Sequence, residues 1–453
     1  MVLKMHVVHS LGWYFPNSSG GTETYVAGLL HALNTMGVPG SVVAATAREA
    51  EECYSYDEVS VARYPVPTDG ALSELRGLEP HRGFQKFQQM LQKQNADVYH
   101  QHTWSRGCNI HHLRYATSIG LPAVLTVHVP SNICIRGTMM LNGDRPCDGE
   151  ILELRCGSCW AQKRGFPHGL ASTLARLPAG LSEWAIRKNG MGKMGSALAT
   201  RGLVRRHRQI FMEASQLADR IIVLSGWLYD SLRLNGIPEG KLVVCRHGVD
   251  QRPNSDSSAS QIVERRDQTR LMIGYLGRAD PVKGIDIVVE ALRGLPIEVP
   301  VELHIHAMDQ EPEGSSYMRR LRELAGNDPR IQFKHPVPRS QIPELIRGFD
   351  LLAVPSRWLE TGPLVVLEAL AAGVPIMGSD LGGIREHVNN NKNGCLLPPE
   401  DISEWRAAIG EFAHNREMLD AIKPETASVR TMLDVAFEMK EVYQQALSGG
   451  TRN

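Results

Sequence analysis

The sequence predicts an α/β protein with two doubly wound units, each built on a largely parallel sheet. The chain has 453 residues, about three times a typical domain length, which favours two domains. Hydrophobic residues make up 42% and charged residues 22% of the chain, as in ordinary globular proteins, so global disorder is excluded. Short β-rich apolar runs alternate with helical patterns along almost the whole chain, which is typical of βαβ units.

The first half of the chain contains six candidate strands. Thr22–Met36 and Gly83–Gln94, which lie between them, have the apolar spacing of helices. We assign residues 1–260 to a Rossmann-like domain with a Cys-containing insertion at about 130–200. The candidate strands are Lys4–His9, Ser41–Thr46, Asp97–His102, Ala123–His128, Arg220–Ser225 and Lys241–Arg246.

The second half repeats this alternation after a boundary. Gln251–Gln261 is polar, Ser-rich and without apolar periodicity, so we interpret it as a linker. Residues 261–453 then form a second Rossmann-like domain, although the helix near Val429–Leu447 can pack back on the first domain. Ligands of doubly wound sheets bind at the carboxyl ends of the strands, so we expect the site in a cleft between the halves. The candidate strands are Leu271–Leu276, Val301–His306, Ile331–Lys334, Leu351–Pro355 and Pro375–Gly378, and helices begin near Ile285, Ser316, Ser340, Leu364 and Ile402.

Charge and hydropathy exclude several classes of protein. Lys and Arg together number 49, as do Asp and Glu, and the resulting zero net charge argues against a dedicated nucleic-acid binder. No apolar run approaches the roughly 20 residues that a membrane-spanning helix needs. The N-terminal apolar run is short and predicts a strand, so we expect a cytoplasmic protein.

The most informative motif is a strand-loop-helix segment over Ser356–Pro375. Its loop carries Glu360 and Gly362. The free amide N–H groups at the helix start, such as those of Leu364 and Val365, point at any phosphate placed above them. The segment therefore predicts an anion site.

Two carboxylates in this segment predict an extended ligand. Glu360 and Glu368 are eight residues apart, and eight helical residues rise about 12 Å, so the two groups cannot bind the same atom. In a nucleotide sugar, one can bind the sugar hydroxyls and the other the ribose hydroxyls. The alternative is one helix-capping Glu and one solvated Glu.

Two basic residues follow the strand that ends near Gly277. Arg278 and Lys283 lie on a loop before a helix, where a planar guanidinium and a compact ammonium fit a diphosphate. The alternative is an ordinary basic loop.

Two further candidates follow predicted strands in the first half. Gly20 and Gly21, within Asn17–Thr24, allow close backbone approach to a ligand, and the alternative is a tight turn. The segment lacks the GxGxxG pattern of dinucleotide-binding oxidoreductases. His128 ends an apolar strand and can hydrogen-bond a hydroxyl or donate to a developing charge, and the alternative is a structural histidine.

At these segments the sequence resembles the retaining glycosyltransferases of family four, which have the GT-B fold. Glu360 to Glu368 resembles the E-x7-E motif of that family, and GRADPVKG, which begins at Gly277, resembles its strand-loop motif. GGTETYV, TVH and RHGVD resemble its glycine loop, its strand-end histidine and its interdomain NGVD segment. The resemblance covers the chain from Met5 to about Phe412.

The resemblance implies transfer of a hexosyl group from a UDP- or GDP-sugar to a saccharide or lipid-linked saccharide, with retention of configuration. It implies a role in cell-surface polysaccharide or glycoconjugate assembly and no catalytic metal. Two departures are the Val129 that follows His128, where an acidic residue is usual, and the His247 that replaces an Asn. The implied contacts are Arg278 and Lys283 to the diphosphate, Glu368 to the ribose, Glu360 and His128 to the transferred sugar, and Gly20 and Gly21 to the phosphate or acceptor oxygen.

Two features of the insertion predict further ligands. Four cysteines with the spacing C-x12-C-x8-C-x2-C match a structural zinc site, with an iron–sulfur cluster or with free or disulfide-bonded cysteines as the alternatives. A basic helix can contact anionic lipid at the inner face of the membrane or an acceptor phosphate, and the alternative is a solvated helix face. The residues are Cys134, Cys147, Cys156 and Cys159 for the metal, and Arg201, Arg205, Arg206 and Arg208 for the helix.

Two other functions compete with glycosyl transfer. A sugar-nucleotide epimerase or a phosphorylase-like enzyme can use the same architecture, although no pyridoxal-phosphate lysine motif is visible. A non-catalytic partner subunit that binds the nucleotide sugar is the other alternative. The intact set of Glu360, Glu368, Arg278 and Lys283 disfavours that subunit, because a pseudoenzyme is free to lose these residues.

Overall fold

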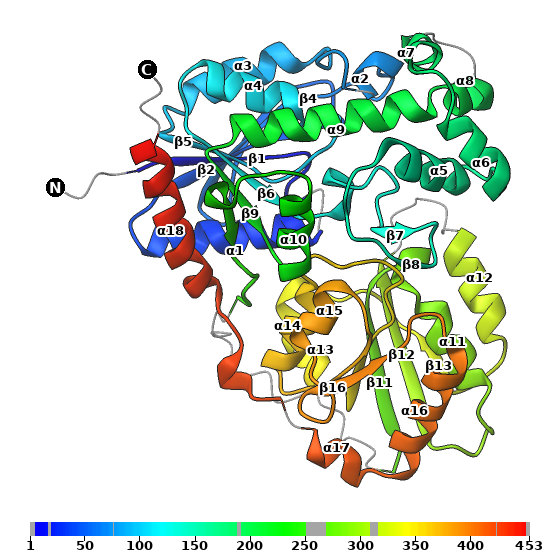
Figure 1. Ribbon diagram of the computed structural model, residues 1–453. Helices are drawn as coiled ribbons and strands as arrows, with labels where there is room; N and C mark the ends of the chain where they lie inside the picture. Colours follow the sequence, from blue (N-terminus) through cyan, green and yellow to red (C-terminus); the bar gives the residue numbers. More distant parts are fainter. Residues whose placement is uncertain are drawn as a thin grey trace. The chain divides into compact units, whose positions relative to one another are not determined.

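The computed structural model describes residues 5–16, 20–75, 77–187, 192–250, 269–308, 316–422 and 424–449. It divides into two compact units (Figure 1). The N-terminal unit comprises Met1–His247 together with Met432–Asn453, and the C-terminal unit comprises Gly248–Thr431. The predicted linker at Gln251–Gln261 lies outside the described residues.

The described strands of the N-terminal unit form an eight-stranded sheet in the order β10-β9-β6-β5-β1-β2-β4-β3. Neighbouring strands are parallel except β3 and β4. The carboxyl ends of β6, β5 and β1 therefore lie next to one another. The bounds are β1 (Val7–Leu11), β2 (Gly40–Thr46), β3 (Glu52–Tyr56), β4 (Val59–Pro65), β5 (Val98–Gln101), β6 (Ala123–Val127), β9 (Arg220–Val223) and β10 (Leu242–Val244).

Helices cover this sheet, and the last helix of the chain is one of them. Helix α18 (Met432–Gly449) packs on α1 (Gly21–Thr35), where Leu29 and Leu33 share a buried cluster with Met439 and Tyr443 (Figure 1). The other helices outside the insertion are α2 (Leu72–Leu75), α3 (Phe84–Lys93), α4 (Ile110–Ser118), α9 (Thr200–Leu217), α10 (Gly226–Leu234) and the 3-10 turn η2 (Glu239–Lys241).

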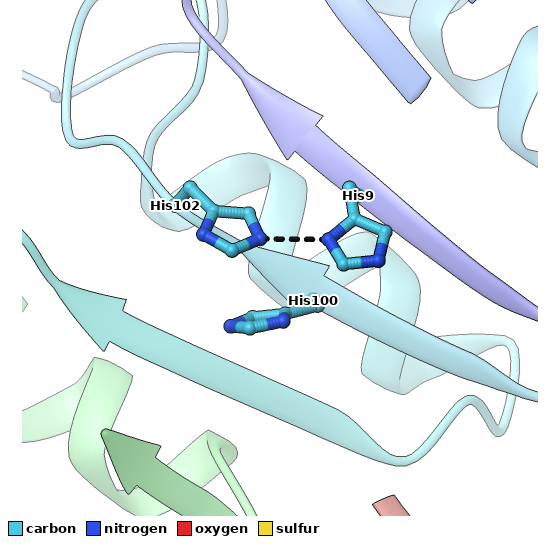
Figure 2. A group of neighbouring side chains, drawn as sticks. All are labelled: His9, His100 and His102. Atoms are coloured by element: carbon cyan, nitrogen blue, oxygen red, sulfur yellow. Dashed lines mark hydrogen bonds between the residues drawn. The ribbon is translucent and has the colours of Figure 1, made fainter. Parts of the chain in front are cut away.

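Polar side chains are buried at the carboxyl ends of the central strands. His9 on β1 pairs in register with His100 on β5, so the two imidazoles lie on the same side of the sheet. Figure 2 shows them beside His102, which follows β5. All three are at most 1% exposed.

The predicted insertion is a small subdomain between β6 and β9. It contains the turn η1 (Pro130–Asn132) and a hairpin of β7 (Met140–Leu141) and β8 (Arg145–Pro146). Four helices follow and lead into α9, against which α5 packs. They are α5 (Glu153–Lys163), α6 (His168–Ala175), α7 (Ala179–Arg187) and α8 (Gly192–Leu198).

The described strands of the C-terminal unit form a six-stranded parallel sheet in the order β13-β12-β11-β14-β15-β16. The strands are β11 (Leu271–Arg278), β12 (Val301–Met308), β13 (Ile331–Phe333), β14 (Leu351–Val354), β15 (Ile376–Ser379) and β16 (Gly394–Leu397). The helices are α11 (Ile285–Arg293), α12 (Ser316–Ala325), α13 (Ile342–Arg347), α14 (Leu364–Ala371), α15 (Gly382–His387), α16 (Ile402–His414) and α17 (Glu417–Ala421), with 3-10 turns η3 (Pro281–Lys283), η4 (Arg339–Gln341) and η5 (Thr426–Ser428).

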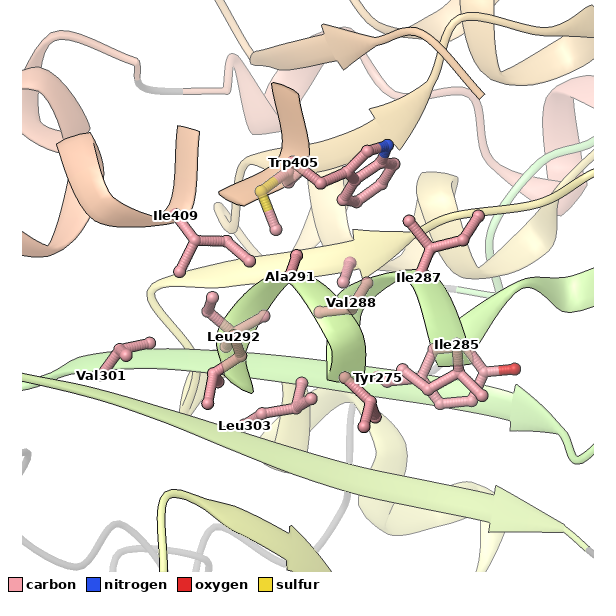
Figure 3. Close-up of a cluster of buried hydrophobic side chains, with 14 of the residues drawn as sticks. Tyr275, Ile285, Ile287, Val288, Ala291, Leu292, Val301, Leu303, Trp405 and Ile409 are labelled. Atoms are coloured by element: carbon pink, nitrogen blue, oxygen red, sulfur yellow. The ribbon is translucent and has the colours of Figure 1, made fainter. Parts of the chain in front are cut away.

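The core of the C-terminal unit lies between this sheet and helices α11 and α16 (Figure 3). Ile287 and Leu292 of α11 and Trp405 of α16 are at most 1% exposed. The Trp405 indole N–H donates to the Pro398 carbonyl over 3.1 Å, so its one polar atom is paired inside the apolar cluster.

The sequence analysis missed the hairpin of β3 and β4. Its turn residues Asp57 and Glu58 have φ values of 52° and 65°, which suit a type I′ turn. Such turns usually contain Asn-Gly or Asp-Gly, because glycine adopts the left-handed region easily and Glu rarely does. The pair Asp57-Glu58 therefore gave no recognisable turn signal.

Trp405 provides a test of this packing. Replacing Trp405 with Ala should destabilise the C-terminal unit by about 3–5 kcal/mol, because it leaves a cavity and an unpaired carbonyl. Differential scanning calorimetry measures the loss. Arg406→Ala, at an exposed position of the same helix, should change stability by at most about 0.5 kcal/mol. Equal losses in the two variants would contradict the packing.

Candidate functional site

In the C-terminal unit, the loops that follow the paired strands β11 and β14 meet each other. Arg278 ends β11, and Lys283 lies in η3. Gly284 follows with φ 69°, and a Cβ there would lie 2.0 Å from the Pro355 carbonyl oxygen. The Arg357 amide donates to the Val282 carbonyl over 2.8 Å. Glycine at position 284 therefore allows the contact between the loops.

Lys283 and Glu360 form an ion pair within this contact. The Lys283 Nζ donates to Glu360 Oε1 over 2.6 Å, and the Ser356 hydroxyl donates to the same oxygen over 2.8 Å. Lys283 also lies over the Trp358 ring, 5.4 Å from its centroid. Burial raises the pKa of Glu360, but the Lys283 ammonium and the hydrogen bonds outweigh burial and hold that pKa below its ordinary value. Glu360 is therefore a buried, charged carboxylate.

The backbone of Glu360 contacts a glycine pair, Gly382 and Gly383, which the sequence analysis missed. The Gly383 amide donates to the Glu360 carbonyl over 2.7 Å. A Cβ on Gly383 would lie 2.8 Å from that carbonyl oxygen, and Gly382 has φ 47°. The signal was the sequence SDLGG between a strand and a helix, but its partner is distant in sequence.

Helix α14 begins at Leu364, as predicted, but the spacing argument counted the residues from Glu360 onward as helical. Pro363 is its N-cap and Leu364 its first residue, so Glu360 lies in the preceding loop and the helical estimate of its separation from Glu368 is wrong. The amides of Leu364 and Val365 are in the first turn and have no acceptor within the helix. Together with Gly362 before them, these amides retain the geometry of an anion site.

Glu368 lies on α14 and is half-buried. Burial raises its pKa above the ordinary value, and Arg339 opposes this shift only in part. Its charge therefore costs stability in the absence of a ligand. Arg278 is the second predicted phosphate contact. Its Nη2 lies 3.7 Å from Asp280 Oδ2, so the two residues form an ion pair.

A second charged cluster supports the same loops. The Arg357 guanidinium donates to Asp286 Oδ1 and to Glu400 Oε1, each over 2.6 Å. The Tyr317 hydroxyl also donates to Asp286 Oδ1 over 2.6 Å. Sequence reasoning missed this cluster, because its four residues come from four separate segments.

In the N-terminal unit, Gly20 caps α1 and the Glu23 carboxylate lies beside it. A Cβ on Gly20 would be 2.5 Å from Glu23 Oε2, and Glu23 is only 8% exposed. The start of the helix therefore already has a neighbouring anion, and Gly21 is the first residue of the helix. Asn17, Ser18 and Ser19 of the predicted motif lie outside the described residues.

His128 directly follows β6 and is 7% exposed. Burial, and then the nearby His247, lower its pKa well below the ordinary value. Its ring is T-shaped against that of Tyr25, with centroids 5.0 Å apart. At neutral pH His128 is therefore an uncharged hydrogen-bonding group.

The four cysteines of the insertion are free thiols in one subdomain. Cys134 follows η1, Cys147 follows β8, and Cys156 and Cys159 are on α5. A metal site needs ligand atoms that lie close together, but among the described residues no three of these sulfurs lie within 4.8 Å of one another. The ring nitrogens of His9, His100 and His102 do lie within that distance of one another. Burial raises the pKa of Cys156 to about 11, and the Asn142 amide donates to Cys159 Sγ over 3.2 Å. The zinc site thus remains a prediction.

The predicted basic helix is part of α9, and most of its arginines have partners within the unit. Arg201 and Arg205 both donate to Glu153, whose pKa falls to about 2 through these contacts. Arg206 donates to the Gly77 carbonyl over 2.8 Å, and Arg208 is exposed. Among the helices of the described ranges, none is long and apolar enough to cross a membrane.

Two family profiles match the chain. The profile of the family described as "Glycosyl transferase 4-like domain" matches residues 20–248, more than half of the chain, and that of "Glycosyl transferases group 1" matches residues 256–428. A D-inositol 3-phosphate glycosyltransferase from Xylanimonas cellulosilytica is 30% identical over 228 residues, which are 48% of this chain and 54% of the relative. The chain spans about a third to a half of the length of the curated relatives it matches.

Two solved structures resemble nearly the whole chain. HepE from Anabaena, in complex with UDP and glucose, has a TM-score of 0.64 and 15% identity, and the match covers 97% of this chain and 99% of that one. Sucrose-phosphate synthase from Thermosynechococcus elongatus has a TM-score of 0.64 and 17% identity, with coverage of 98% and 100%. These similarities confirm the predicted GT-B fold class, with two Rossmann-like units.

Because of the ion pair, we expect the pH dependence of folding stability to be inverted in a Lys283→Met variant. In the native chain the lowered pKa of Glu360 adds stability above the unfolded pKa of about 4.5, and this contribution is lost as pH falls through the folded pKa. Without Lys283, burial raises that pKa, so stability should instead fall as pH rises, by about 3–5 kcal/mol at neutral pH.

Melting temperatures measured between about pH 4 and pH 8 test this reversal. The double variant Lys283→Met/Glu360→Gln should recover most of the loss at neutral pH, because it leaves no unpaired buried charge. Parallel pH curves for Lys283→Met and the native chain would contradict the ion pair.

Proposed function

Because the chain belongs to the glycosyltransferases that carry a glycosyl transferase 4-like domain, we propose that it transfers a hexosyl group from a nucleoside-diphosphate sugar to a hydroxyl of a saccharide or lipid-linked saccharide. The observation that carries the proposal is the paired Lys283 and Glu360 beside the start of α14 in the C-terminal unit. Cations and helix amides suit a diphosphate, while a buried carboxylate suits sugar hydroxyls.

Each part of the donor has a proposed partner in the C-terminal unit. Arg278, Lys283 and the Leu364 and Val365 amides would bind the diphosphate, as at other helix N-termini. The Lys283 ammonium carries three protons, so it can contact a phosphate oxygen while it still donates to Glu360. UDP is the preferred nucleotide in this proposal, because HepE, which has the same fold, is found with UDP and glucose.

The leaving group explains why fixed cations matter. As the bond between the sugar and the diphosphate breaks, negative charge grows on the diphosphate oxygens. Cations and amides that are already in place stabilise this charge without reorganising. Glu360 would hold the hydroxyls of the transferred sugar, and Glu368 would hold the ribose. This chemistry requires no metal at the leaving group, and retention of configuration is part of the proposal.

The N-terminal unit would bind the acceptor. Gly20 and Gly21 permit close backbone approach, and the neutral His128 would hydrogen-bond the transferred sugar. The D-inositol 3-phosphate glycosyltransferases among the relatives support a polyol or sugar hydroxyl as acceptor. Cell-surface polysaccharide or glycoconjugate assembly is the proposed setting. Lipid contact through α9 would depend mainly on Arg208, since Arg201 and Arg205 already pair with Glu153.

The donor site is tested by a thermal-shift panel of UDP- and GDP-sugars, with UDP, GDP and NAD as controls. A nucleotide that binds the native state raises the melting temperature. Glu368→Gln should weaken this binding by about tenfold or more, because it removes a charged acceptor for ribose hydroxyls. Glu404→Gln, at an exposed position of α16, should bind like the native chain.

Glu368→Gln has a second, independent effect on stability. The raised pKa of Glu368 means that its ionised form costs stability as pH rises through that pKa. Without nucleotide, the Gln variant should therefore melt higher than the native chain at neutral pH. A lower melting temperature, or an unchanged nucleotide shift, would contradict the assigned role.

Activity separates the proposed function from its alternatives. Incubation of the bound nucleotide sugar with sugar and polyol acceptors should yield a glycoside whose anomeric configuration, measured by NMR, matches that of the donor. Conversion of the donor sugar without an acceptor would indicate an epimerase. Binding without any turnover would indicate a non-catalytic subunit.

We also propose that the cysteines of the insertion hold structural zinc. Cys156 and Cys159 occupy the first two turns of α5 and Cys147 follows a hairpin, an arrangement that suits a metal knuckle. Their sulfurs would have to approach one another on binding. Metal analysis of freshly purified, reduced protein should find a stoichiometric amount of zinc that Cys156→Ser loses and Cys395→Ser keeps. Absence of both zinc and iron would overturn this proposal.

A further inference from the structure

The N-terminal unit buries a chain of three hydrogen-bonded imidazoles. Nδ1 of His9 lies 2.9 Å from Nε2 of His102, and Nδ1 of His102 lies 3.1 Å from Nε2 of His128. The three residues come from the neighbouring strands β1, β5 and β6 or directly follow them. Figure 2 shows the first link. The chain therefore runs along the carboxyl ends of the sheet to His128, the residue proposed to contact the transferred sugar.

His100 belongs to the same cluster but is not a link in the chain. Its Nδ1 lies 2.7 Å from the Tyr443 hydroxyl, and its Nε2 lies 2.7 Å from the Thr126 hydroxyl. Both ring nitrogens thus have partners outside the chain. His100 therefore provides packing, and its ring is held in place independently of His9 and His102.

The contacts favour a hydrogen-bonded chain over a metal site. The nearest ligand atoms of His9, His100 and His102 lie within 4.8 Å of one another. The His9 and His102 nitrogens that face each other are already joined by a hydrogen bond. Hydrogen bonding accounts for the observed geometry without an ion.

Burial keeps each imidazole in the chain neutral. It lowers the pKa of His9 to about 3 and holds the pKa values of His102 and His128 well below the ordinary value. Each neutral ring carries one proton, and each link needs one donor and one acceptor. The protons must therefore all point the same way along the chain, either toward His128 or away from it.

The far end of the chain selects between these two directions. His9 Nε2 is buried and has no hydrogen-bond partner among the described residues. Protons that point away from His128 would place an N–H on this atom, and buried N–H groups without an acceptor are rare in native proteins. Protons that point toward His128 leave His9 Nε2 bare instead.

We infer that His9 and His102 are positioning residues that hold the His128 ring and fix its proton on Nδ1. His128 Nε2 then accepts from His102 and cannot take a further proton without breaking the chain. Toward the sugar, His128 acts as an N–H donor and not as a base. The catalytic consequence rests on the proposed function, whereas the position of the proton does not.

The proton position is tested directly by NMR of the full chain labelled with 15N-histidine. The signals of His128 are identified by their disappearance in His128→Gln. We expect the protonated-nitrogen signature at Nδ1 of His128 and the bare-nitrogen signature at Nε2. The reverse pattern would overturn the inference, whether or not the protein transfers sugar.

Kinetics test the positioning role. His102→Leu removes both links, so kcat should fall by about tenfold to a hundredfold, as with other residues that orient a functional histidine, while KM for the donor changes little. His102→Gln keeps one donor and one acceptor and should restore most of kcat. Tyr443→Phe removes one hydroxyl from His100 in the same buried cluster and should leave kcat unchanged.

Other outcomes are equally informative. If His102→Leu does not fold, His9→Leu provides a second test. His9 contacts His102 and is not hydrogen-bonded to His128. Its loss should still let the His128 proton exchange between Nδ1 and Nε2. An active protein in which His102→Leu and Tyr443→Phe have the same kcat would overturn the positioning role. A stoichiometric metal that is lost on His102→Gln and kept on Cys156→Ser would also overturn it, because metal ligation replaces these hydrogen bonds.

Discussion

The ion pair between Lys283 and Glu360 holds together the part of the C-terminal unit on which its site depends. It joins the loops that follow β11 and β14, and glycines at positions 284 and 383 let backbone approach from both sides. A buried carboxylate is costly unless it is paired and hydrogen-bonded, and the Lys283 ammonium and the Ser356 hydroxyl supply both contacts. The Lys283 side chain nevertheless keeps 24% of its surface exposed. The Lys283 ammonium that stabilises Glu360 is therefore also partly open to solvent, as its proposed contact with a donor phosphate requires.

The sequence was sufficient to predict two Rossmann-like units, but not the contacts between the loops of the C-terminal unit. The strand ends predicted that Arg278, Lys283 and Glu360 lie at one edge of a sheet. That Lys283 pairs with Glu360, 77 residues away, depends on β11 and β14 being neighbours, which no local pattern records. The helix start near Leu364 was predicted, but the estimated separation of Glu360 and Glu368 treated the whole segment between them as helical, although Glu360 precedes the helix.

The N-terminal unit illustrates the same limit with uncharged groups. His128 taken alone had two interpretations, a functional residue or a satisfied structural one. In the structure, His128 Nε2 lies within hydrogen-bond distance of His102 Nδ1, and this structural contact does not rule out the functional role proposed for His128. The register that places His9 opposite His100 is what brings the histidines together. Residues 9, 100, 102 and 128 belong to three strands or directly follow them, so their contact is a property of strand order and register. The sequence shows only that each of the three predicted strands ends in a histidine.

The two units differ in the charge of their candidate site residues, which are cationic in the C-terminal unit and neutral or anionic in the N-terminal unit. The C-terminal unit carries the cations of Arg278 and Lys283 and the first-turn amides of α14, and groups of these kinds suit a diphosphate. The N-terminal unit places the Glu23 carboxylate beside Gly20 at the start of α1 and keeps His128 neutral. A phosphate there would meet a like charge, whereas a hydroxyl can donate to a carboxylate and accept from an imidazole N–H. In the proposed function, Gly20 and Gly21 therefore suit the acceptor oxygen better than the donor phosphate.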